Sequence, residues 1–171
     1  MRFESPVGAI VIVATERGVS KVIVRPRGGR ACRADVVCSR GGVGRARRLA
    51  ERMRRQLGAY FGGRLRRFDV PLDLSSGTRF QQRVWRACRA IPHGEVWSYG
   101  RLAKRSGCAR AARAVGGAMG ANPLPIVVPC HRVVRSDGTL GGYGLGVPLK
   151  RRLLGLEGSA IFRAASPGAG G

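Results

Sequence analysis

Two short helical segments joined by a glycine-containing turn constrain the fold of this chain more than any other feature of its sequence. Ser98 can cap the first segment, and Ser106-Gly107 interrupts it. Helical composition resumes over residues 110–121. A helix, a turn with glycine and a second helix form the helix-turn-helix pattern, but ordinary helix pairs share it. The pattern therefore predicts the local fold and leaves the function open.

The second of these segments is composed of unusually small residues. Its adjacent glycines, Gly116 and Gly117, cost about 1 kcal/mol each in a helix relative to alanine. Small side chains let a backbone approach another surface closely, while Arg110 and Arg113 can still reach outward. We therefore expect this helix to lie against a partner at close range.

The charge of the chain favours a polyanionic partner. Its 171 residues carry a net charge of +23, and nucleic acid is the first partner to consider for so basic a protein. Only Lys21, Lys104 and Lys150 among the 32 basic residues are lysines. An arginine excess beside 27 glycines is also what biased coding would produce, so the placement of the charges has to identify the partner.

The first half of the chain has the pattern of a small α/β unit. β-Branched residues over 9–14 and 20–24 flank a turn and predict a β-hairpin. Residues 45–61 place apolar side chains at helical spacing, with arginines on the other face. Residues 25–43 are rich in arginine and glycine and predict a loop, or an irregular extra strand around residues 35–38. We expect a small sheet covered by one helix.

An extended segment separates the two halves. Pro71 keeps residues 68–74 extended, and Ser75-Ser76-Gly77 ends that segment. Thr78 and Gln81 then have the spacing of a capping box at the start of a helix. These breaks place a domain boundary near residue 78.

The last helix is expected to begin at Pro148 and to bury one stripe. Leucine recurs at helical spacing along it, at Leu149, Leu153 and Leu156. The residues after 163 are small, being alanine, glycine, one serine and one proline, so the tail over 164–171 is expected to be disordered.

The cysteines indicate reduced thiols rather than a disulfide framework. Positions 32, 38, 88, 108 and 130 form no C-x-x-C pair, and their number is odd. Cys88 falls on a predicted buried stripe and His93 in a turn expected to be solvated. With His131 the only other histidine, Cys32 and Cys38 lack a second pair of zinc ligands, so we expect no metal.

The sequence gives no sign of a membrane segment. No stretch approaches about 18 uninterrupted apolar residues. Residues 1–10 carry Arg2 and Glu4 where a secretory signal would be apolar. We expect a cytoplasmic protein, associated with the nucleoid when bound to DNA, and no membrane partner.

One motif carries the chemistry. An apolar run over residues 125–128, expected to be a strand, leads into Pro129-Cys130-His131-Arg132, and Glu157 follows later. A thiol, an imidazole and a carboxylate together can make a thiolate, which is the nucleophilic form of cysteine. Neighbours on an extended chain point to opposite faces, so a water would have to bridge His131 and Cys130 unless the backbone turns. Cys-His-Glu hydrolases contain the same three groups.

A series of short motifs covers almost all of the second half. They are Phe80-Gln81, Val84-Trp85, Ile91-Pro92 with Gly94, Ser98-Tyr99-Gly100 with Leu102-Ala103, Ala112-Arg113-Ala114-Val115-Gly116, Asn122-Pro123, Pro129-Cys130-His131-Arg132-Val133, Gly141-Gly142-Tyr143, and Leu153-Leu154 to Glu157-Gly158. The first half contributes only Ser5-Pro6, Gly8 and Tyr60-Phe61-Gly62. On these motifs the chain resembles the O6-alkylguanine-DNA alkyltransferases, also called methylated-DNA–protein-cysteine methyltransferases.

The resemblance implies a fold class for each half. Residues 1–78 would form an α/β N-terminal domain of the ribonuclease H-like type. Residues 79–163 would form a mainly α C-terminal domain with a winged helix-turn-helix.

The resemblance also implies DNA repair by direct reversal. Cys130 would take the alkyl group from O6 of guanine in one displacement, with O4-alkylthymine in DNA as a second candidate substrate. A thioether has no carbonyl for water to attack, so the cysteine would not be regenerated and each molecule would act once. No cofactor is needed, because the damaged base brings the group.

Roles for the site residues follow from the resemblance. Glu157 would hold the imidazole of His131, which would act through a water to deprotonate Cys130. Asn122 is carried over as a hydrogen-bonding residue of the site. Tyr99 is carried over as the group that assists departure of the guanine and helps to rotate the nucleotide.

The pocket for the base would be lined by residues from two loops. Pro125 and Tyr143 would form its walls. Leu145 stands where some relatives carry smaller residues, so we expect it to narrow the mouth of the pocket and to disfavour bulky adducts.

The implied partner is double-stranded DNA containing O6-alkylguanine, bound from the minor groove by a monomer. The paired base has to be flipped out of the stack at a cost of a few kcal/mol. Arg113 resembles the intercalating arginine that fills the vacated place. The other residues expected to contact DNA are Ala111, Ala112, Ala114, Gly116, Ser98 and Arg132.

Three other classes of protein share part of this pattern. A non-catalytic binder of damaged DNA would lack the nucleophile Cys130. A Cys-His-Glu hydrolase would leave Arg113 and the glycine-rich helix unexplained. A helix-turn-helix regulator would explain the charge but not the cysteine motif.

Overall fold

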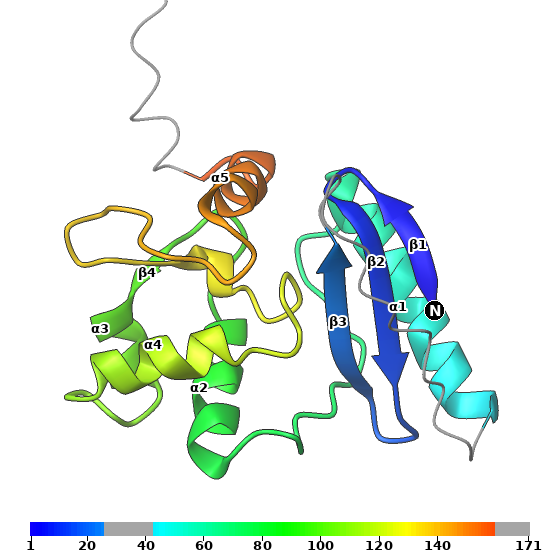
Figure 1. The fold of residues 1–171 in the computed structure, drawn as a ribbon, viewed down its shortest axis with the longest axis horizontal. Helices are drawn as coiled ribbons and strands as arrows, with labels where there is room; N and C mark the ends of the chain where they lie inside the picture. Colours follow the sequence, from blue (N-terminus) through cyan, green and yellow to red (C-terminus); the bar gives the residue numbers. More distant parts are fainter. Residues whose placement is uncertain (26–42, 160–171) are drawn as a thin grey trace, which may run out of the picture.

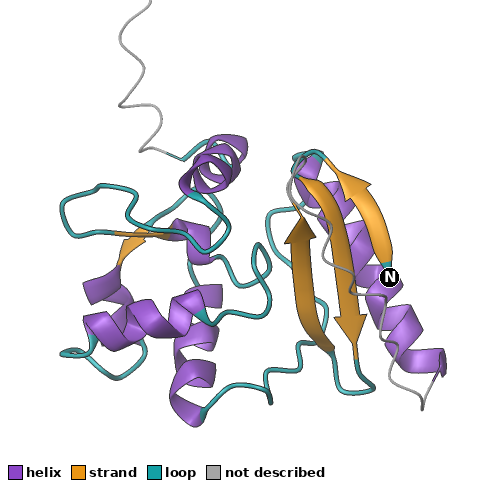
Figure 2. Ribbon diagram, viewed as in Figure 1, coloured by secondary structure: helices purple, strands orange, loops and turns teal. Residues whose placement is uncertain are grey.

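A computed structural model describes residues 1–25 and 43–159 of the chain. The strands of the first half lie on one side of the molecule, and most of the helices, with a short two-stranded sheet, lie on the other (Figures 1 and 2). The loop predicted over residues 25–43, with Cys32 and Cys38, lies outside the described residues except for its two end residues, and the tail predicted over 164–171 lies outside them altogether.

The first half is an antiparallel sheet of three strands covered by one helix. The strands are β1 (Arg2–Ser5), β2 (Gly8–Ala14) and β3 (Val19–Arg25), in the order β1-β2-β3. The predicted hairpin is confirmed as β2 and β3, whereas β1 was not predicted because it lacks a β-branched run.

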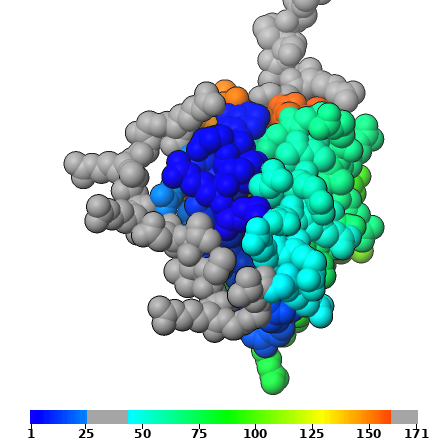
Figure 3. All heavy atoms as spheres, turned by 90° about the vertical axis from the view of Figure 1, so that its right-hand side faces the viewer, coloured from blue at the N-terminus to red at the C-terminus, as the bar shows by residue number. Residues whose placement is uncertain are grey.

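The helix α1 (Val43–Phe61) packs on this sheet, as its periodicity predicts (Figure 1). Its buried stripe includes Met53, Leu57 and Tyr60, while its arginines lie on the opposite, exposed face. Figure 3 shows β1 and α1 adjoining at the surface of the molecule.

The segment that follows α1 is extended and lies against β3, as Pro71 predicts. The Val19 N–H donates to the Pro71 carbonyl at 2.9 Å, and the Asp73 N–H donates to the Val19 carbonyl at 2.9 Å. A Cβ on Gly18 would lie 2.7 Å from the Pro71 oxygen, so only glycine permits this approach.

The second half contains four α-helices and a short two-stranded sheet among the described residues. The helices are α2 (Arg79–Arg89), α3 (Tyr99–Arg105), α4 (Ala112–Gly120) and α5 (Val147–Leu156). The strands β4 (Trp97–Ser98) and β5 (Val133–Val134) pair in parallel. Helices α2, α3 and α4 pack against one another.

The predicted caps of two helices are confirmed. Thr78 and Gln81 exchange hydrogen bonds as a capping box at the start of α2. The Ser98 hydroxyl accepts the backbone N–H of Arg101 and so caps α3. Cys88 is fully buried on α2, as expected for a core thiol.

Two local predictions are wrong. Residues 125–128 do not form a strand; Pro123, Pro125 and Pro129 deprive this segment of backbone donors, and Ile126 adopts a φ of 74°. Leu156 is 40% exposed rather than buried, because α5 ends there and the chain turns to place Glu157 inside.

One cluster of buried apolar side chains runs through both halves, from Val7 of the sheet region to Leu153 of α5. The helices and strands of both halves therefore pack around one continuous core. The boundary near residue 78 stays a prediction.

Candidate active site

The cysteine motif lies in a tight buried turn. Residues Cys130–Arg132 form a 3-10 turn, η1, in which the Cys130 N–H donates to the Val128 carbonyl at 2.8 Å. The backbone thus turns where the sequence suggested the end of a strand. No hydrogen bond joins the Cys130 thiol to the His131 ring in the part of the chain that the structure describes, since the two side chains find different partners.

Asn122 fixes the sulfur side of the site. Its Oδ1 accepts the Leu124 N–H at 2.9 Å, which orients the amide so that Nδ2 donates to the Val128 carbonyl at 2.9 Å and to Cys130 Sγ at 3.2 Å. A donor aimed at sulfur stabilises the thiolate. Asn122 is therefore brought to Cys130, as the sequence predicted.

Glu157 lies at the other side of the turn, with both carboxylate oxygens occupied. Oε1 is contacted by His131 Nε2 at 2.8 Å, Arg132 Nη2 at 2.9 Å and the Tyr60 hydroxyl at 2.6 Å. Oε2 accepts Arg132 Nε at 2.8 Å and the Gly94 N–H at 3.4 Å. Burial opposes ionisation, but the hydrogen bonds of His131 and Arg132 and the charge of Arg132 outweigh it and hold the pKa of Glu157 below its usual range.

This carboxylate determines which nitrogen of His131 can act as a base. An ionised Glu157 only accepts hydrogen bonds, so Nε2 must carry the proton and Nδ1 must present its lone pair. Nδ1 is buried and has no partner among the described residues. Burial lowers the pKa of His131, against the opposing effect of Glu157, and keeps the ring neutral near pH 7.

The Cys130 thiol is protonated in this environment. Burial raises its pKa, while the hydrogen bond from Asn122, the nearby Tyr143 hydroxyl and the charge of Lys150 act in the opposite direction. The Tyr143 hydroxyl lies outside hydrogen-bond geometry and has no other partner among the described residues. A base is therefore needed to produce the thiolate.

Lys150 is a buried cation near the thiol that the sequence did not single out. Its side chain is fully buried in α5, and Nζ donates to the Val133 carbonyl at 2.6 Å and to the Leu140 carbonyl. Burial lowers its pKa to about 8. These contacts tie α5 to β5 and to the loop that carries Tyr143.

A pocket of about 230 Å³ opens at the sulfur. Asn122, Pro125, Cys130, Tyr143 and Leu145 all line it, so the structure brings together the predicted catalytic thiol and the predicted pocket walls. Residues 21–24 of β3 line the opposite side. This contribution could not be predicted from the sequence, because nothing local links the hairpin to the cysteine motif.

Tyr99 lies near Cys130 and against α4, which lines the pocket through Met119 and Gly120. Tyr99 is half-buried, and its ring lies 3.9 Å from the position that a Cβ on Gly116 would occupy. Burial and the neighbouring Cys130 raise the pKa of Tyr99, so its hydroxyl keeps its proton. Arg113 and Ala114 are exposed in the first turn of α4, and Ala111 and Ala112 are half-buried.

Arg132 corrects one expectation. It was expected to contact DNA, but it is only 5% exposed, and its guanidinium donates to Glu157 and, at 2.7 Å, to the Ile91 carbonyl. Its guanidinium holds the carboxylate of Glu157 in place and faces the protein interior. Ser98 is half-buried and its hydroxyl caps α3.

Tyr60 is a residue of the site that sequence reasoning placed only in the core. Its hydroxyl reaches Glu157 across 97 residues of sequence, from the helix of the first half. Its place in the weakly matching Tyr60-Phe61-Gly62 motif was the one available signal.

The described residues contain no group of three or more His, Cys, Asp or Glu side chains that could hold a metal ion. Within the same described ranges, no helix is both long and apolar enough to cross a membrane.

Comparison with known proteins agrees with this geometry. Residues 79–159 match the family model described as the DNA-binding domain of 6-O-methylguanine DNA methyltransferase. A methylated-DNA–protein-cysteine methyltransferase of Methanosarcina acetivorans is 43% identical over 157 residues, which cover 92% of this chain and 96% of that protein. The chain belongs to the family of methylated-DNA–protein-cysteine methyltransferases.

Two further relatives show how far the likeness extends. The protein of the same name from Mycolicibacterium paratuberculosis is 58% identical over 102 residues, which cover 60% of this chain and 61% of that protein. A crystal structure of Mycobacterium tuberculosis OGT in complex with DNA superposes with a TM-score of 0.75 and 40% identity, covering 94% of this chain and 95% of that one.

Proposed function

We propose that the protein repairs DNA by transferring the alkyl group of O6-alkylguanine to Cys130, once per molecule. The observation that carries the proposal is the position of Cys130: its sulfur lines a pocket, and the neighbouring His131 and Glu157 form a buried base whose protonation is fixed. A small pocket that is lined by Tyr143 beside the sulfur suits one flipped base better than a peptide.

The step begins with removal of the thiol proton. His131 Nδ1 has the free lone pair, and we propose that a water passes the proton from Cys130 to it, because no direct contact exists among the described residues. Glu157 stabilises the imidazolium that results. Asn122 Nδ2 stabilises the thiolate until it reacts.

The thiolate then displaces the base. A bond forms between Sγ and the alkyl carbon, the bond from that carbon to O6 breaks, and its electron pair remains on guanine. Tyr99, whose hydroxyl keeps its proton, would donate a proton to the departing base and recover one from solvent. The thioether left on Cys130 cannot be hydrolysed, which ends the activity of that molecule.

The proposed partner is double-stranded DNA, entered from the minor groove by α4. The relative solved in complex with DNA and the match to a DNA-binding domain support DNA itself as the partner. Arg113 is exposed at the first turn of α4, where it could fill the place of a flipped nucleotide. Ala111, Ala112, Ala114 and Gly116, with Ser98, would form the surface that approaches the groove.

The same proposal includes the type of each domain, the oligomeric state, the location and a second substrate. Residues 79–163 would act as a winged helix-turn-helix in which α3 supports α4, and residues 1–78 as a ribonuclease H-like domain. The protein would work as a monomer in the cytoplasm, with O4-alkylthymine in DNA as a second candidate substrate.

Peptide mass spectrometry tests the transfer. Trypsin places Cys130 in the peptide 114–132, and each of the other four cysteines in a different peptide. After incubation with a duplex containing O6-methylguanine, only peptide 114–132 should gain one methyl group, while unmodified guanine is restored. Turnover of the lesion without modification of the protein would refute the proposal.

The size limit expected from Leu145 has its own test. Leu145 lines the pocket with Cys130, so it should slow transfer of a benzyl group more than transfer of a methyl group. Leu145→Ala should raise the benzyl rate toward the methyl rate. Equal rates for both adducts in the unaltered protein would rule out this role.

A further inference from the structure

A second and larger cavity lies on the other side of the segment that leads to Cys130. It measures about 710 Å³ and lies between the end of α2, the chain after α1 and residues 126–129. Pro125 and Cys130 line the pocket of about 230 Å³ at the sulfur. Ile126, Val127 and Pro129 line this second cavity instead. Nothing in the proposed alkyl transfer uses it.

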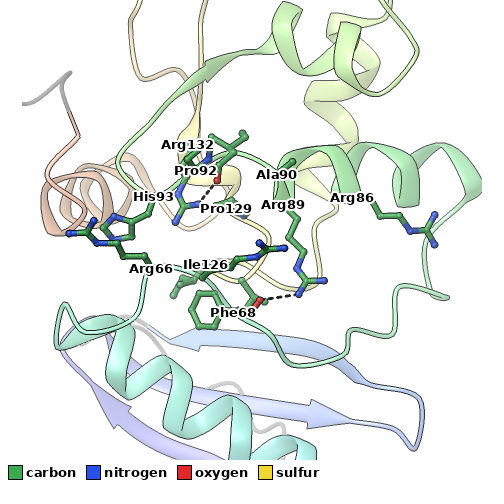
Figure 4. A pocket seen from close by; sticks show the side chains of 13 residues that line it. Arg66, Phe68, Arg86, Arg89, Ala90, Pro92, His93, Ile126, Pro129 and Arg132 are labelled. Carbon is green, nitrogen blue, oxygen red and sulfur yellow. Dashed lines mark hydrogen bonds between the residues drawn. The ribbon is translucent and has the colours of Figure 1, made fainter.

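The cavity is rimmed by arginines without acidic partners. Arg66, Arg67, Arg86 and Arg89 line it, and none of them forms an ion pair with a described residue. Figure 4 shows Arg66 beside His93 at one end, and Arg89 and Arg86 toward the other. No Asp or Glu of the described residues lines the cavity.

These like charges are close enough to disturb one another. Burial and the charge of Arg67 lower the pKa of Arg89 against the opposing charge of Asp69, and burial followed by the charges of Arg132 and Arg66 lowers the pKa of His93. Glu157 is the opposing charge near His93, but it is already engaged by Arg132. An anion in the cavity would relieve this repulsion.

The floor of the cavity is apolar. Phe68, Ile91, Ile126 and Val127 line it between the arginines, and Figure 4 shows Phe68 and Ile126 in the middle. A volume of this order and a mixed lining of apolar and cationic groups are typical of sites for small molecules. An inorganic ion would make no contact with the apolar floor, whereas a base or sugar would pack on it.

We propose that this cavity binds the phosphates of a nucleotide, with Arg66, Arg67 and Arg89 on the phosphate oxygens and the base or sugar on the apolar floor. Arginine is suited to phosphate because its guanidinium offers paired donors in a plane. The same chemistry is present in single-stranded DNA, which is the other source of such a group. A duplex is too wide to enter a cavity of this size.

The test compares two variants that lose the same charge. Arg66→Gln/Arg67→Gln removes two exposed rim arginines that make no hydrogen bond to a described residue, so the fold should be unaffected. Arg151→Gln/Arg152→Gln is the control, because both side chains are exposed on α5 and neither lines the cavity. Calorimetric titration at physiological salt, where diffuse attraction is screened, would use deoxyguanosine triphosphate, inorganic triphosphate and a single strand of eight thymidines.

Deoxyguanosine triphosphate should bind the unaltered protein more tightly than inorganic triphosphate, and the cavity variant should lose about tenfold or more in affinity. The control should change by less than about twofold. A thymidine strand that binds better than the nucleotide, and loses affinity only in the cavity variant, would identify nucleic acid as the source. Equal losses in both variants, or no binding of any probe, would overturn the proposal.

A footprint locates the ligand independently. Phenylglyoxal modifies exposed arginines, and peptide mass spectrometry reports each position. Bound deoxyguanosine triphosphate should protect Arg66, Arg67 and Arg89 while Arg151 and Arg152 react as before. Uniform protection of all these arginines would show diffuse charge attraction and contradict the site.

Discussion

The buried hydrogen-bonded group around Glu157, called the relay below, and the exposed face of α4 are built in opposite ways. In the relay, both oxygens of Glu157 are occupied by His131, Arg132, Tyr60 and Gly94. On α4, Arg113 makes no hydrogen bond or ion pair with a described residue, and Gly117 exposes bare backbone.

The difference teaches how the two tasks are divided. A base must hold its geometry before the substrate arrives, so the relay is fixed by contacts inside the protein. A surface that enters a groove needs its side chains and backbone free for the partner. Changes in the relay should therefore alter stability and transfer from every substrate, whereas changes on α4 should act through contact with duplex DNA and leave transfer from a free base unchanged.

The largest effect is expected from Glu157→Gln. It leaves Arg132 as a buried charge without its partner, which should lower the free energy of unfolding by about 3–5 kcal/mol. Without the carboxylate that fixes the proton on His131 Nε2 and stabilises the imidazolium, transfer to Cys130 should slow by about 100-fold or more in a single-turnover assay.

A second variant separates these two effects. Glu157→Gln/Arg132→Met removes both charges, so it should recover much of the stability but none of the rate. A rate restored along with the stability would show that Glu157 serves the fold and not the reaction.

Lys150→Met should lower the free energy of unfolding by about 2 kcal/mol at pH 7, because two carbonyls lose a charged donor. The pKa of Lys150 is about 8 in the folded protein and lies near its ordinary value when unfolded. Between these values the unfolded state binds more protons, so stability rises with pH in the unaltered protein. Denaturant titrations at pH 7 and pH 10 should show the difference between protein and variant widening. A constant difference would mean that this amine does not titrate there.

Tyr60→Phe tests how much the first half contributes to the relay. It removes the hydroxyl that donates to Glu157 and leaves the ring in place, so stability should fall by about 1.5–2 kcal/mol. Affinity for undamaged DNA, measured by fluorescence anisotropy, should not change. Unchanged stability would mean that the contact with Glu157 adds nothing to the fold.

Arg113→Ala should slow transfer from duplex DNA by about tenfold or more, since the flipped nucleotide loses the side chain that replaces it. Transfer from a free O6-alkylguanine base and the denaturation midpoint should stay the same. Arg54→Ala, an equal charge loss on the exposed face of α1, is the control. Equal slowing in both variants would show that Arg113 contributes only non-specific electrostatic attraction to DNA.

The same division explains what the sequence could predict. Local signals were sufficient for the capped helices, because Thr78 and Gln81 lie within one turn of each other. Residue chemistry singled out Cys130, His131 and Glu157, and the resemblance, carried by short contiguous motifs, gave each its role.

No local pattern in the sequence predicts the contacts between distant segments. Tyr60 meets Glu157 from another half of the chain, and β3 meets the pocket only after folding. Arg132 was misplaced on the DNA surface because an arginine is by default an exposed residue. Only the structure shows the buried carboxylate that keeps it inside.

The smallest expected effect gives the finest test of the exposed face of α4. A Cβ added at Gly117 would meet nothing within 4 Å, and Gly58, which is exposed in the last turn of α1, is equally unobstructed. Each glycine-to-alanine change should therefore raise the free energy of unfolding by about 0.5–1 kcal/mol. Gly117 lies four residues after Arg113 and so shares its face, which means that only Gly117→Ala should weaken DNA binding. Equal DNA affinity for the two variants would show that the bare backbone of α4 does not lie at the interface.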